Sequence, residues 1–305
     1  QKSSDVIKTL EIEMKRSGVQ VRLNSEVLSV ARADDGFVVK TDLKDETFDK
    51  VIVATGGNSY QSTGSTGDGY KFAKNFGLNI VEPRQALVPI ILAQNVSSLQ
   101  GISLKNVTLT AYDENEKEIS SEFGEMLFTQ RGVSGPIALT TSSYINRKNK
   151  VVLSLDLKPA LDEETLDRRI LRDFDERKNQ DIKNVTRALL PERLNSYVIK
   201  RAGIQESKKV NSITKQEREK LVYTLKNLTF DVAGLAPFTE AIVTAGGVDV
   251  KGLKPTCECK NVDGLYFVGE TIDVDALTGG FNLQLAFATG VCAARDILKK
   301  SGAEV

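Results

Sequence analysis

The residues best placed to do chemistry lie in the segment GLYFVGETIDVDALTGGFNLQLAFATG, at residues 264–290. An apolar strand pattern runs into a Gly-Glu pair, two aspartates follow, and a Gly-Gly pair precedes a helix pattern. Glycine lets a ligand approach the backbone, and a helix N-terminus offers unpaired amides with partial positive charge. The segment therefore predicts a site for an electron-rich carbonyl or a reduced anionic ring. Glu270, Asp273 and Asp275 are candidates to bind sugar-type hydroxyls, and helix capping or a solvated loop is their alternative role.

Two further apolar strand patterns also end in glycine, namely VIVATGG at residues 51–57 and AIVTAGG at residues 241–247. In an open α/β sheet, ligands bind beyond the carboxyl ends of the strands, where the chain must turn without side-chain bulk. Three such ends from distant parts of the chain predict one shared crevice. A simple tight turn is the alternative explanation at each of them.

The GSTGDG stretch at residues 64–69 has its glycines in the order G-x-x-G-x-G. This order differs from the G-x-G-x-x-G fingerprint of dinucleotide-binding loops, and no phosphate-loop lysine motif occurs either. We expect a loop that enters a short helix, with Asp68 as the N-cap.

Composition narrows the classes of function. The chain has 305 residues, of which 40% are hydrophobic and 27% charged, as in ordinary globular proteins. Its 41 basic residues balance its 41 acidic residues, so we expect a small-molecule substrate rather than nucleic acid or an anionic membrane. No apolar run approaches the roughly 20 residues of a membrane span, and a cytoplasmic location is expected.

The absence of histidine excludes Ser-His-Asp and Cys-His hydrolases. Chemistry must then rely on other side chains, backbone dipoles or a cofactor. The three cysteines, Cys257, Cys259 and Cys292, are too few for a disulfide framework, and no second pair accompanies Cys257 and Cys259 to complete a zinc site. We expect no metal, and we expect those two cysteines on opposite faces of a strand.

The elements that must position these residues follow from hydrophobic periodicity. Residues 3–17 predict a helix with Ser3 or Ser4 as N-cap, and residues 19–23 (VQVRL) alternate as a strand. Residues 26–42 predict a hairpin with its turn at Asp34-Asp35-Gly36. The chain begins at Gln1 with no strand ahead of the first helix, so we expect a preceding segment that would complete the sheet.

The chain then divides into five predicted parts. Residues 1–86 form the first part of a cofactor-binding domain, 87–160 an inserted β-rich domain, 161–227 an inserted helical subdomain, 228–240 a return strand, and 241–305 the second part of the cofactor-binding domain. Asp162 is the predicted cap of the first inserted helix. The charged faces of these helices favour a solvated subdomain over a partner-binding surface.

Four motifs in this order carry a resemblance: ATGGNSYQSTGSTGDGY, LFTQRGVSGP, AIVTAGGV and the 264–290 segment. Over essentially all 305 residues, the sequence resembles the bacterial FAD-dependent oxidoreductases of the BaiN or YhiN type, also called aminoacetone-oxidase-like. The resemblance implies an α/β, Rossmann-like two-dinucleotide-binding flavoprotein fold with a β-plus-helical insertion, N-terminally incomplete here. It also implies FAD as the cofactor and NAD(P)H as the reductant.

The resemblance assigns cofactor-binding roles residue by residue. The implied FAD contacts are Val27, Ala54, Thr55, Gly56, Gly57, Gly246, Gly247, Gly269, Glu270, Asp273, Gly279, Gly280, Phe281, Asn282 and Leu283. Among them, Val27 would face the adenine, Glu270 and Asp273 the ribityl and pyrophosphate region, and Gly280 to Leu283 the flavin pyrimidine.

Two departures from the family pattern bear on the chemistry. The family opens with a strand and a glycine-rich turn that hold the ADP half of FAD, and this chain has neither. Gln130 stands where the family usually carries histidine, which removes the proton transfer assigned to that position. Gln130 could still orient a substrate carbonyl and Arg131 could pair with a carboxylate, so both are catalytic candidates, with an exposed turn as the alternative.

The resulting hypothesis is hydride transfer between NAD(P)H or a small organic substrate and a non-covalent flavin. One alternative is an enzyme like fumarate reductase or ketosteroid dehydrogenase, in which Arg131 or Tyr60 would donate the proton. An RNA-modifying flavoprotein is disfavoured by the zero net charge. A non-catalytic nucleotide-binding or flavin-binding module is the third alternative. Substrate and oligomeric state do not follow from the sequence.

Overall fold

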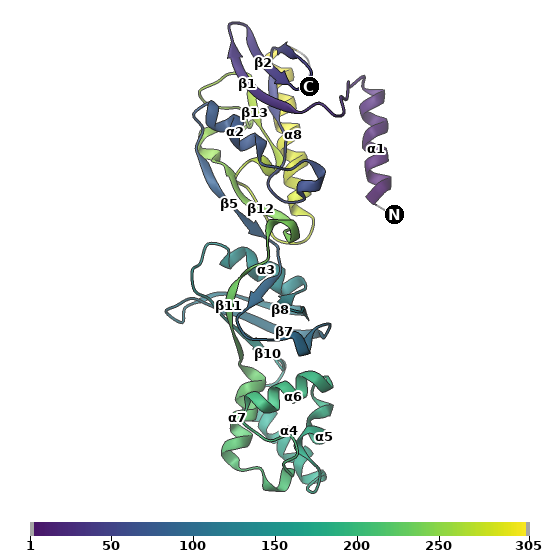
Figure 1. Cartoon of the computed structure of the whole chain (residues 1–305), viewed down its shortest axis with the longest axis vertical. Coiled ribbons are helices and arrows are strands. Elements are labelled where there is room, and N and C mark those ends of the chain that lie inside the picture. Colours follow the sequence, from purple (N-terminus) through teal and green to yellow (C-terminus); the bar gives the residue numbers. More distant parts are fainter. Residues whose placement is uncertain (1–2, 303–305) are drawn as a thin grey trace. The chain divides into compact units, whose positions relative to one another are not determined.

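The computed structural model describes residues 3–302 (Figure 1). The chain forms two compact units, Gln1–Val51 and Ile52–Val305, and each is described by itself.

The first unit holds one helix and a three-stranded antiparallel sheet. The helix is α1 (Ser3–Arg16), and the strands are β1 (Val27–Ala33), β2 (Gly36–Thr41) and β3 (Asp45–Phe48). The predicted hairpin is confirmed, with Val30 opposite Val39. Gly36 has a φ of +119°, and a side chain there would run into the backbone of Phe48. Phe37 is fully buried and anchors this small sheet.

Two sequence predictions in this unit need correction. The strand predicted at residues 19–23 is wrong, because the segment has no strand conformation and its apolar side chains are exposed. Alternation alone does not make a strand where no neighbouring strand pairs with it. Ser3 and Ser4 both lie inside α1, and the residue before that helix lies outside the described residues.

In the second unit, residues 52–86 and 241–302 form what we call the strand-end region. Its elements are β4 (Val51–Val53), α2 (Asp68–Asn75), β5 (Ile80–Ala86), β12 (Val243–Val248), β13 (Leu265–Phe267) and α8 (Phe281–Lys300). β12 pairs with β5 antiparallel, and β13 pairs with β4. These described strands form two separate pairs, and the Rossmann-like arrangement implied by the resemblance stays a prediction. Asp68 is the first residue of α2 and not its N-cap, because the left-handed Gly67 takes that position.

Residues 87–240 form what we call the inserted region, which begins with a closed antiparallel barrel. Its strand order is β10-β11-β6-β9-β8-β7. The bounds are β6 (Ile90–Leu92), β7 (Ser103–Tyr112), β8 (Glu118–Phe128), β9 (Gly132–Ser134), β10 (Val152–Asp156) and β11 (Leu228–Leu235). The segments predicted as β-rich therefore do form strands, and closure leaves the barrel without free sheet edges.

Helices complete the inserted region (Figure 1). They are α3 (Pro136–Ile145), α4 (Glu163–Glu176), α5 (Ile182–Val185), α6 (Glu192–Arg201) and α7 (Lys215–Lys226). The predicted cap is confirmed, since Asp162 accepts a hydrogen bond of 2.7 Å from the Thr165 amide. Thr214 and Glu217 form a capping box at the start of α7. Buried side chains from the barrel and the helices, such as Leu155 and Leu221, belong to one continuous core.

The chain crosses between the two regions twice, and the two crossings are joined. The Ala236 amide donates to the Pro89 carbonyl at 2.9 Å, and the Ile242 amide to the Leu87 carbonyl at 3.3 Å. Val88 and Ala236 are both buried at this junction. These hydrogen bonds hold the two crossings of the chain next to each other at the junction.

A buried carboxylate connects α8 to the rest of the strand-end region. Glu258, 1% exposed, accepts from Lys254 at 2.7 Å, from Lys300 at 2.5 Å and from the Gly264 amide at 2.9 Å. Tyr266 donates to Asp296 of α8 at 2.7 Å. Burial by itself would raise the pKa of Glu258, but the two ammonium groups and the amide hold it at about 2.

The predicted arrangement of Cys257 and Cys259 on opposite faces of a strand is wrong. Both are buried, neither lies in a strand, and Cys257 has a left-handed backbone with a φ of +64°. The chain bends tightly here so that Glu258 can reach both lysines. Among residues 3–302, no helix is long and apolar enough to cross a membrane.

Candidate functional site

Three strand ends from distant parts of the chain meet in the strand-end region. The Thr244 hydroxyl accepts hydrogen bonds from the Asn58 amide at 2.8 Å and from the Ser59 amide at 3.1 Å. The Thr244 amide donates to Glu270 at 2.9 Å, and the Thr271 hydroxyl donates to the Gly56 carbonyl at 3.3 Å. These hydrogen bonds link three segments: the chain after β4, β12 itself and the turn after β13. The crevice predicted between them stays a prediction.

The glycines at these strand ends are explained by close packing of the chain on itself. A side chain at Gly57 would lie 2.7 Å from the Glu270 carboxylate, and one at Gly247 would lie 2.7 Å from the Thr271 carbonyl. Gly246 and Gly269 have φ values of +92° and +67°. The structure needs glycine here before any ligand binds. Ala54 and Thr55 lie just beyond β4, where the Thr55 hydroxyl accepts from the Gly69 amide at 3.2 Å.

The acidic residues at this place are in unusual environments. Burial raises the pKa of Glu270, and the nearby Asp275 adds to the effect. Burial likewise raises the pKa of Asp275, with a further contribution from Asp273, while Arg147 opposes it. Glu270 accepts from Thr244, so one of its oxygens holds the strand ends together.

A buried hydroxyl near Glu270 lacks a partner. The Tyr70 hydroxyl, on α2, makes no hydrogen bond within the described residues. Burial and then the charge of Glu270 raise the pKa of Tyr70 to about 12. A buried, unpaired hydroxyl costs free energy, which a polar ligand would recover.

The N-terminus of α8 is open. Gly280, with a φ of +83°, caps the helix without a side-chain hydrogen bond, and a Cβ there would meet nothing within 4 Å. The first helical hydrogen bond runs from the Gln284 amide to the Gly280 carbonyl at 3.1 Å, so the preceding amides point toward the helix end. Gly279 also has a positive φ, and Phe281 is 58% exposed.

Asn282 holds the loop that leads into α8. Its side-chain oxygen accepts from the Ala276 amide at 2.9 Å, and its amide nitrogen donates to the Ala276 carbonyl at 2.7 Å. Its neighbour Leu283 is 67% exposed. Asn282 thereby orders the approach to the open helix end.

The backbone of Asp273 is held by its own amide, which donates to the Val248 carbonyl at 2.9 Å.

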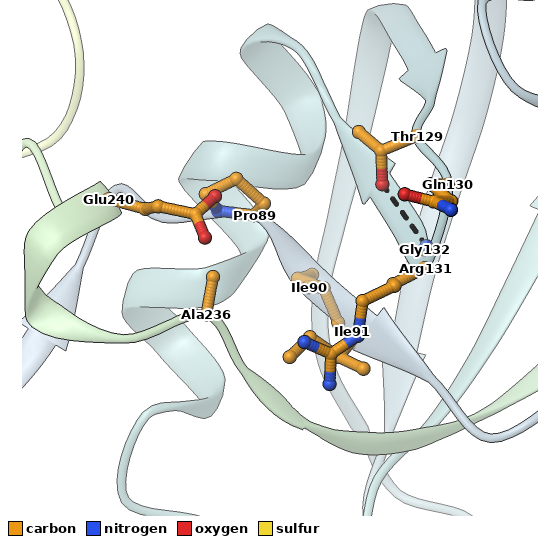
Figure 2. Close-up of a pocket in the computed structure, with 9 residues that line it drawn as sticks. All are labelled: Pro89, Ile90, Ile91, Thr129, Gln130, Arg131, Gly132, Ala236 and Glu240. Carbon is orange, nitrogen blue, oxygen red and sulfur yellow. Dashed lines mark hydrogen bonds between the residues drawn. The ribbon is translucent and has the colours of Figure 1, made fainter.

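A pocket lies at the junction between the inserted region and the strand-end region, and Figure 2 shows it in close-up. We call it the rim pocket; its volume is about 180 Å³. It is lined by Pro89, Ile90, Ile91, Thr129, Gln130, Arg131, Gly132, Ala236 and Glu240. Both catalytic candidates from the sequence are therefore in one pocket, and both crossings of the chain contribute walls.

A tight hairpin tip positions Gln130 and Arg131. The Thr129 amide donates to the Gly132 carbonyl at 2.8 Å, and the Gly132 amide donates back to the Thr129 hydroxyl at 3.1 Å. A side chain at Gly132 would run into the backbone of Ile90. The tip is therefore rigid, with Gln130 on it and Glu240 on the opposite wall (Figure 2).

Sequence reasoning missed Glu240 and Pro89 as pocket residues. Glu240 ends a short 3-10 turn, η5 (Phe238–Glu240), just before β12. No local sequence signal marks either of them as a pocket residue. Two other predicted residues lie elsewhere. Val27 belongs to β1 of the first unit, and Tyr60, with a φ of +54° and 56% exposed, does not line the rim pocket.

Comparison with known proteins decides the family. Residues 84–243 match the family described as "HI0933-like protein barrel and H2TH domain", which covers the barrel and the helices after it. The chain belongs to this HI0933-like family of BaiN/YhiN-type flavoproteins. Residues 3–87 also match the family "Flavin containing amine oxidoreductase".

Curated relatives of this flavoprotein span nearly the whole chain. It is 33% identical over 302 residues to the "Ribosomal RNA dihydrouridine synthase" of Escherichia coli, covering 97% of this chain and 72% of that protein. It is 31% identical to the protein of the same name from Haemophilus influenzae, covering 98% and 73%. It is 26% identical to the "3-dehydro-bile acid delta(4,6)-reductase" of Clostridium scindens, covering 96% and 73%. The chain is an oxidoreductase with a flavin cofactor.

The residues of the strand-end region fit a flavin. Gly280 leaves open space at a helix N-terminus whose amides suit an electron-rich ring oxygen. The unpaired Tyr70 hydroxyl and the acidic residues near it offer polar contacts for a hydroxylated chain. The individual contacts assigned to FAD from the sequence stay predictions.

Proposed function

We propose that this flavoprotein binds FAD, is reduced by NAD(P)H and reduces a uracil ring in ribosomal RNA to dihydrouracil. The observation that carries the proposal is the identity of 33% and 31%, over nearly the whole chain, to two ribosomal RNA dihydrouridine synthases. The bile acid reductase is more distant, at 26%. All three names describe the reduction of a carbon–carbon double bond.

The overall reaction adds two hydrogens across the C5–C6 bond of uracil. FAD, when bound, would supply the hydride chemistry that couples the oxidation of NAD(P)H to the reduction of one ring carbon. The other carbon takes a proton, and the double bond becomes a single bond. Water that enters the rim pocket, or Glu240, the one carboxyl group among its lining residues, supplies that proton.

Gln130 and Arg131 would bind the base. The Gln130 amide both donates and accepts hydrogen bonds, which matches the carbonyl and N–H groups on the edge of uracil. Arg131 can only donate and keeps its charge, so it would hold a carbonyl oxygen or a phosphate. The hairpin tip favours this role, because its hydrogen bonds fix the backbone that carries both residues at one wall of the pocket.

The nucleic-acid substrate departs from the expectation based on net charge. Zero net charge describes the average over the chain, whereas RNA contacts depend on where the charges lie. A small enone-type substrate is the second candidate, and the bile acid reductase among the relatives favours it.

The first test is whether the purified protein carries flavin, and whether NADH or NADPH bleaches its absorbance. The reduced protein is then mixed with unmodified ribosomal RNA, and dihydrouridine is measured by mass spectrometry. We expect dihydrouridine in proportion to the NAD(P)H consumed. Reoxidation by a steroid enone but not by RNA would contradict the RNA proposal and support the second candidate.

Variants connect this reaction to the rim pocket. We expect Gln130→Ala to slow dihydrouridine formation about 10- to 100-fold through lost substrate contacts, while bleaching by NAD(P)H stays as in the wild type. Gln216→Ala, at an exposed position of α7, is the matched control and should leave both rates unchanged.

A further inference from the structure

The zero net charge hides a strongly basic segment. Residues 177–227 contain 13 Lys and Arg but only five Asp and Glu. Each of the five acidic residues is paired within the segment: Asp181 with Lys209, Glu192 with Arg187, Glu206 with Lys200, Glu217 with Lys208, and Glu219 with Lys215. The segment therefore keeps a surplus of cations after its own ion pairs are made.

Two of the surplus cations line one cavity, which we call the helical cavity. It lies between the end of α6, the face of α7 and the start of β11, and its volume is about 330 Å³. Arg201 and Lys220 line it, and no acidic side chain does. Within residues 3–302, no carboxylate lies within 4 Å of either charged group. The cavity thus presents uncompensated positive charge.

The guanidinium of Arg201 is held in place. It donates to the Thr229 carbonyl at 3.1 Å, at the beginning of β11. The Asn227 amide donates to the Tyr223 carbonyl at 2.7 Å, which fixes the chain between α7 and β11. Asn227 and Thr229 add neutral hydrogen-bonding groups to the wall. The cavity therefore combines an ordered guanidinium and ordered backbone with the exposed ammonium group of Lys220.

An exposed aromatic ring stands beside these cations. Tyr223 lines the same cavity and is 58% exposed, one helical turn after Lys220. Proteins that bind single-stranded nucleic acid combine a positive groove for the phosphates with aromatic rings on which bases stack. Arg201, Lys220 and Tyr223 supply both parts in one place.

We propose that the helical cavity binds single-stranded RNA, with a phosphate held by Arg201 and Lys220 and a base stacked on Tyr223. The proposal rests on the proposed function and adds a second RNA contact, made by residues other than those of the rim pocket. A site of this kind contributes affinity to the substrate without taking part in the reduction.

Binding is tested with the flavin-loaded protein and a fluorescein-labelled single-stranded RNA of about ten nucleotides, followed by fluorescence anisotropy at several salt concentrations. We expect Tyr223→Ala to weaken binding roughly 5- to 150-fold, as for loss of one base stack, and Tyr223→Phe to keep it within about twofold. Lys220→Gln should weaken binding and lower the salt slope by about one.

Lys215→Gln is the matched control, because Lys215 lies on the same helix but pairs with Glu219. It should bind RNA as the wild type does. The proposal is overturned if the wild type binds no RNA, if Tyr223→Ala and Lys220→Gln bind as tightly as the wild type, or if Lys215→Gln costs as much as Lys220→Gln. Equal displacement of RNA from wild type and Tyr223→Ala by inorganic polyphosphate would show an anion site only, and would also overturn it.

Dihydrouridine formation at saturating RNA separates this inference from the proposed function. Normal product with unaltered RNA binding in the cavity variants would refute the cavity and leave the proposed function standing. RNA binding that depends on Tyr223, without any dihydrouridine, would refute the proposed function and leave the cavity standing.

Discussion

The inserted region and the strand-end region stabilise themselves in different ways. In the inserted region a closed barrel and its helices share one core, with Leu153, Leu155 and Leu166 fully buried. In the strand-end region the long helix α8 buries only Ala293, while Leu283 and Phe287 are more than half exposed. Both regions bury apolar side chains, but those of the strand-end region form small separate clusters, and hydrogen bonds and ion pairs join its strand ends and loops. A binding site at strand ends joined by hydrogen bonds leaves neighbouring backbone groups accessible to a ligand.

The largest expected effect tests the core of the inserted region. Leu155→Ala should lower the free energy of unfolding by about 2–5 kcal/mol, because it opens a cavity in a close-packed core. Leu283→Ala, at an exposed position of α8, should change it by less than about 0.5 kcal/mol. Urea unfolding of both variants measures the contrast. Similar losses for the two would mean that the regions do not differ as described.

The next prediction concerns acid stability of the strand-end region. The pKa of Glu258 is about 2 in the folded protein against an ordinary 4.5. A depressed carboxyl pKa stabilises the fold above the unfolded-state pKa, and this stability is lost as pH falls from about 4.5 toward 2. The loss should amount to about 3 kcal/mol in full below pH 2, of which about 2 kcal/mol should be lost by pH 3. Glu258→Gln should remove most of this pH dependence, as measured by urea unfolding between pH 6 and pH 3, and an unchanged slope would contradict the assignment.

A smaller effect is expected at the open end of α8. Gly280→Ala places a Cβ where a ligand ring would approach and strains a backbone at φ +83°. We expect FAD affinity to fall about 10- to 100-fold, or about 1.4–2.7 kcal/mol, by fluorescence titration. Gly290→Ala, inside the same helix with nothing within 4 Å, should bind FAD as the wild type does. Retention of full affinity by Gly280→Ala would argue against a flavin at this helix end.

The smallest effect is local to one helix of the inserted region. Asp162→Ala removes the cap on the Thr165 amide and should cost about 1 kcal/mol of unfolding free energy. Asp175→Ala, near the other end of α4 with only an exposed pairing to Lys178, should cost less than about 0.5 kcal/mol. Thermal unfolding of the pair measures the difference, and equal stabilities would show that the cap contributes nothing.

Local signals allowed much of the fold to be predicted. The cap that Asp162 provides for the Thr165 amide was predicted correctly, and so was the hairpin with its Asp-Asp-Gly turn at residues 34–36. Both features depend on residues only a few positions apart in the sequence. The strand predicted at residues 19–23 failed because strand formation depends on a partner strand that alternation does not reveal. Asp68 failed as an N-cap because the left-handed Gly67 begins that helix.

Part of the candidate site could likewise be predicted from the sequence, and part could not. Glycine next to carboxylate at a strand end is visible in the sequence, and Gln130 and Arg131 stand in a motif that the family shares. Glu240 joins them only because the barrel closes and brings a residue more than 100 positions away to the same pocket. The residues next to Glu240 in the sequence carry no signal that it would lie in one pocket with Gln130 and Arg131.

The sequence by itself determined the family, the flavin-type motifs and most helices, since these depend on residue types at short spacing. Tertiary structure alone decided that Thr244 and Glu270 join three strand ends and that Arg201, Lys220 and Tyr223 share one cavity. It also decided that the Tyr70 hydroxyl has no hydrogen-bond partner among residues 3–302. These arrangements depend on which distant segments pack together. Packing is set by burial of the whole apolar surface at once and therefore cannot be read from any one stretch of residues.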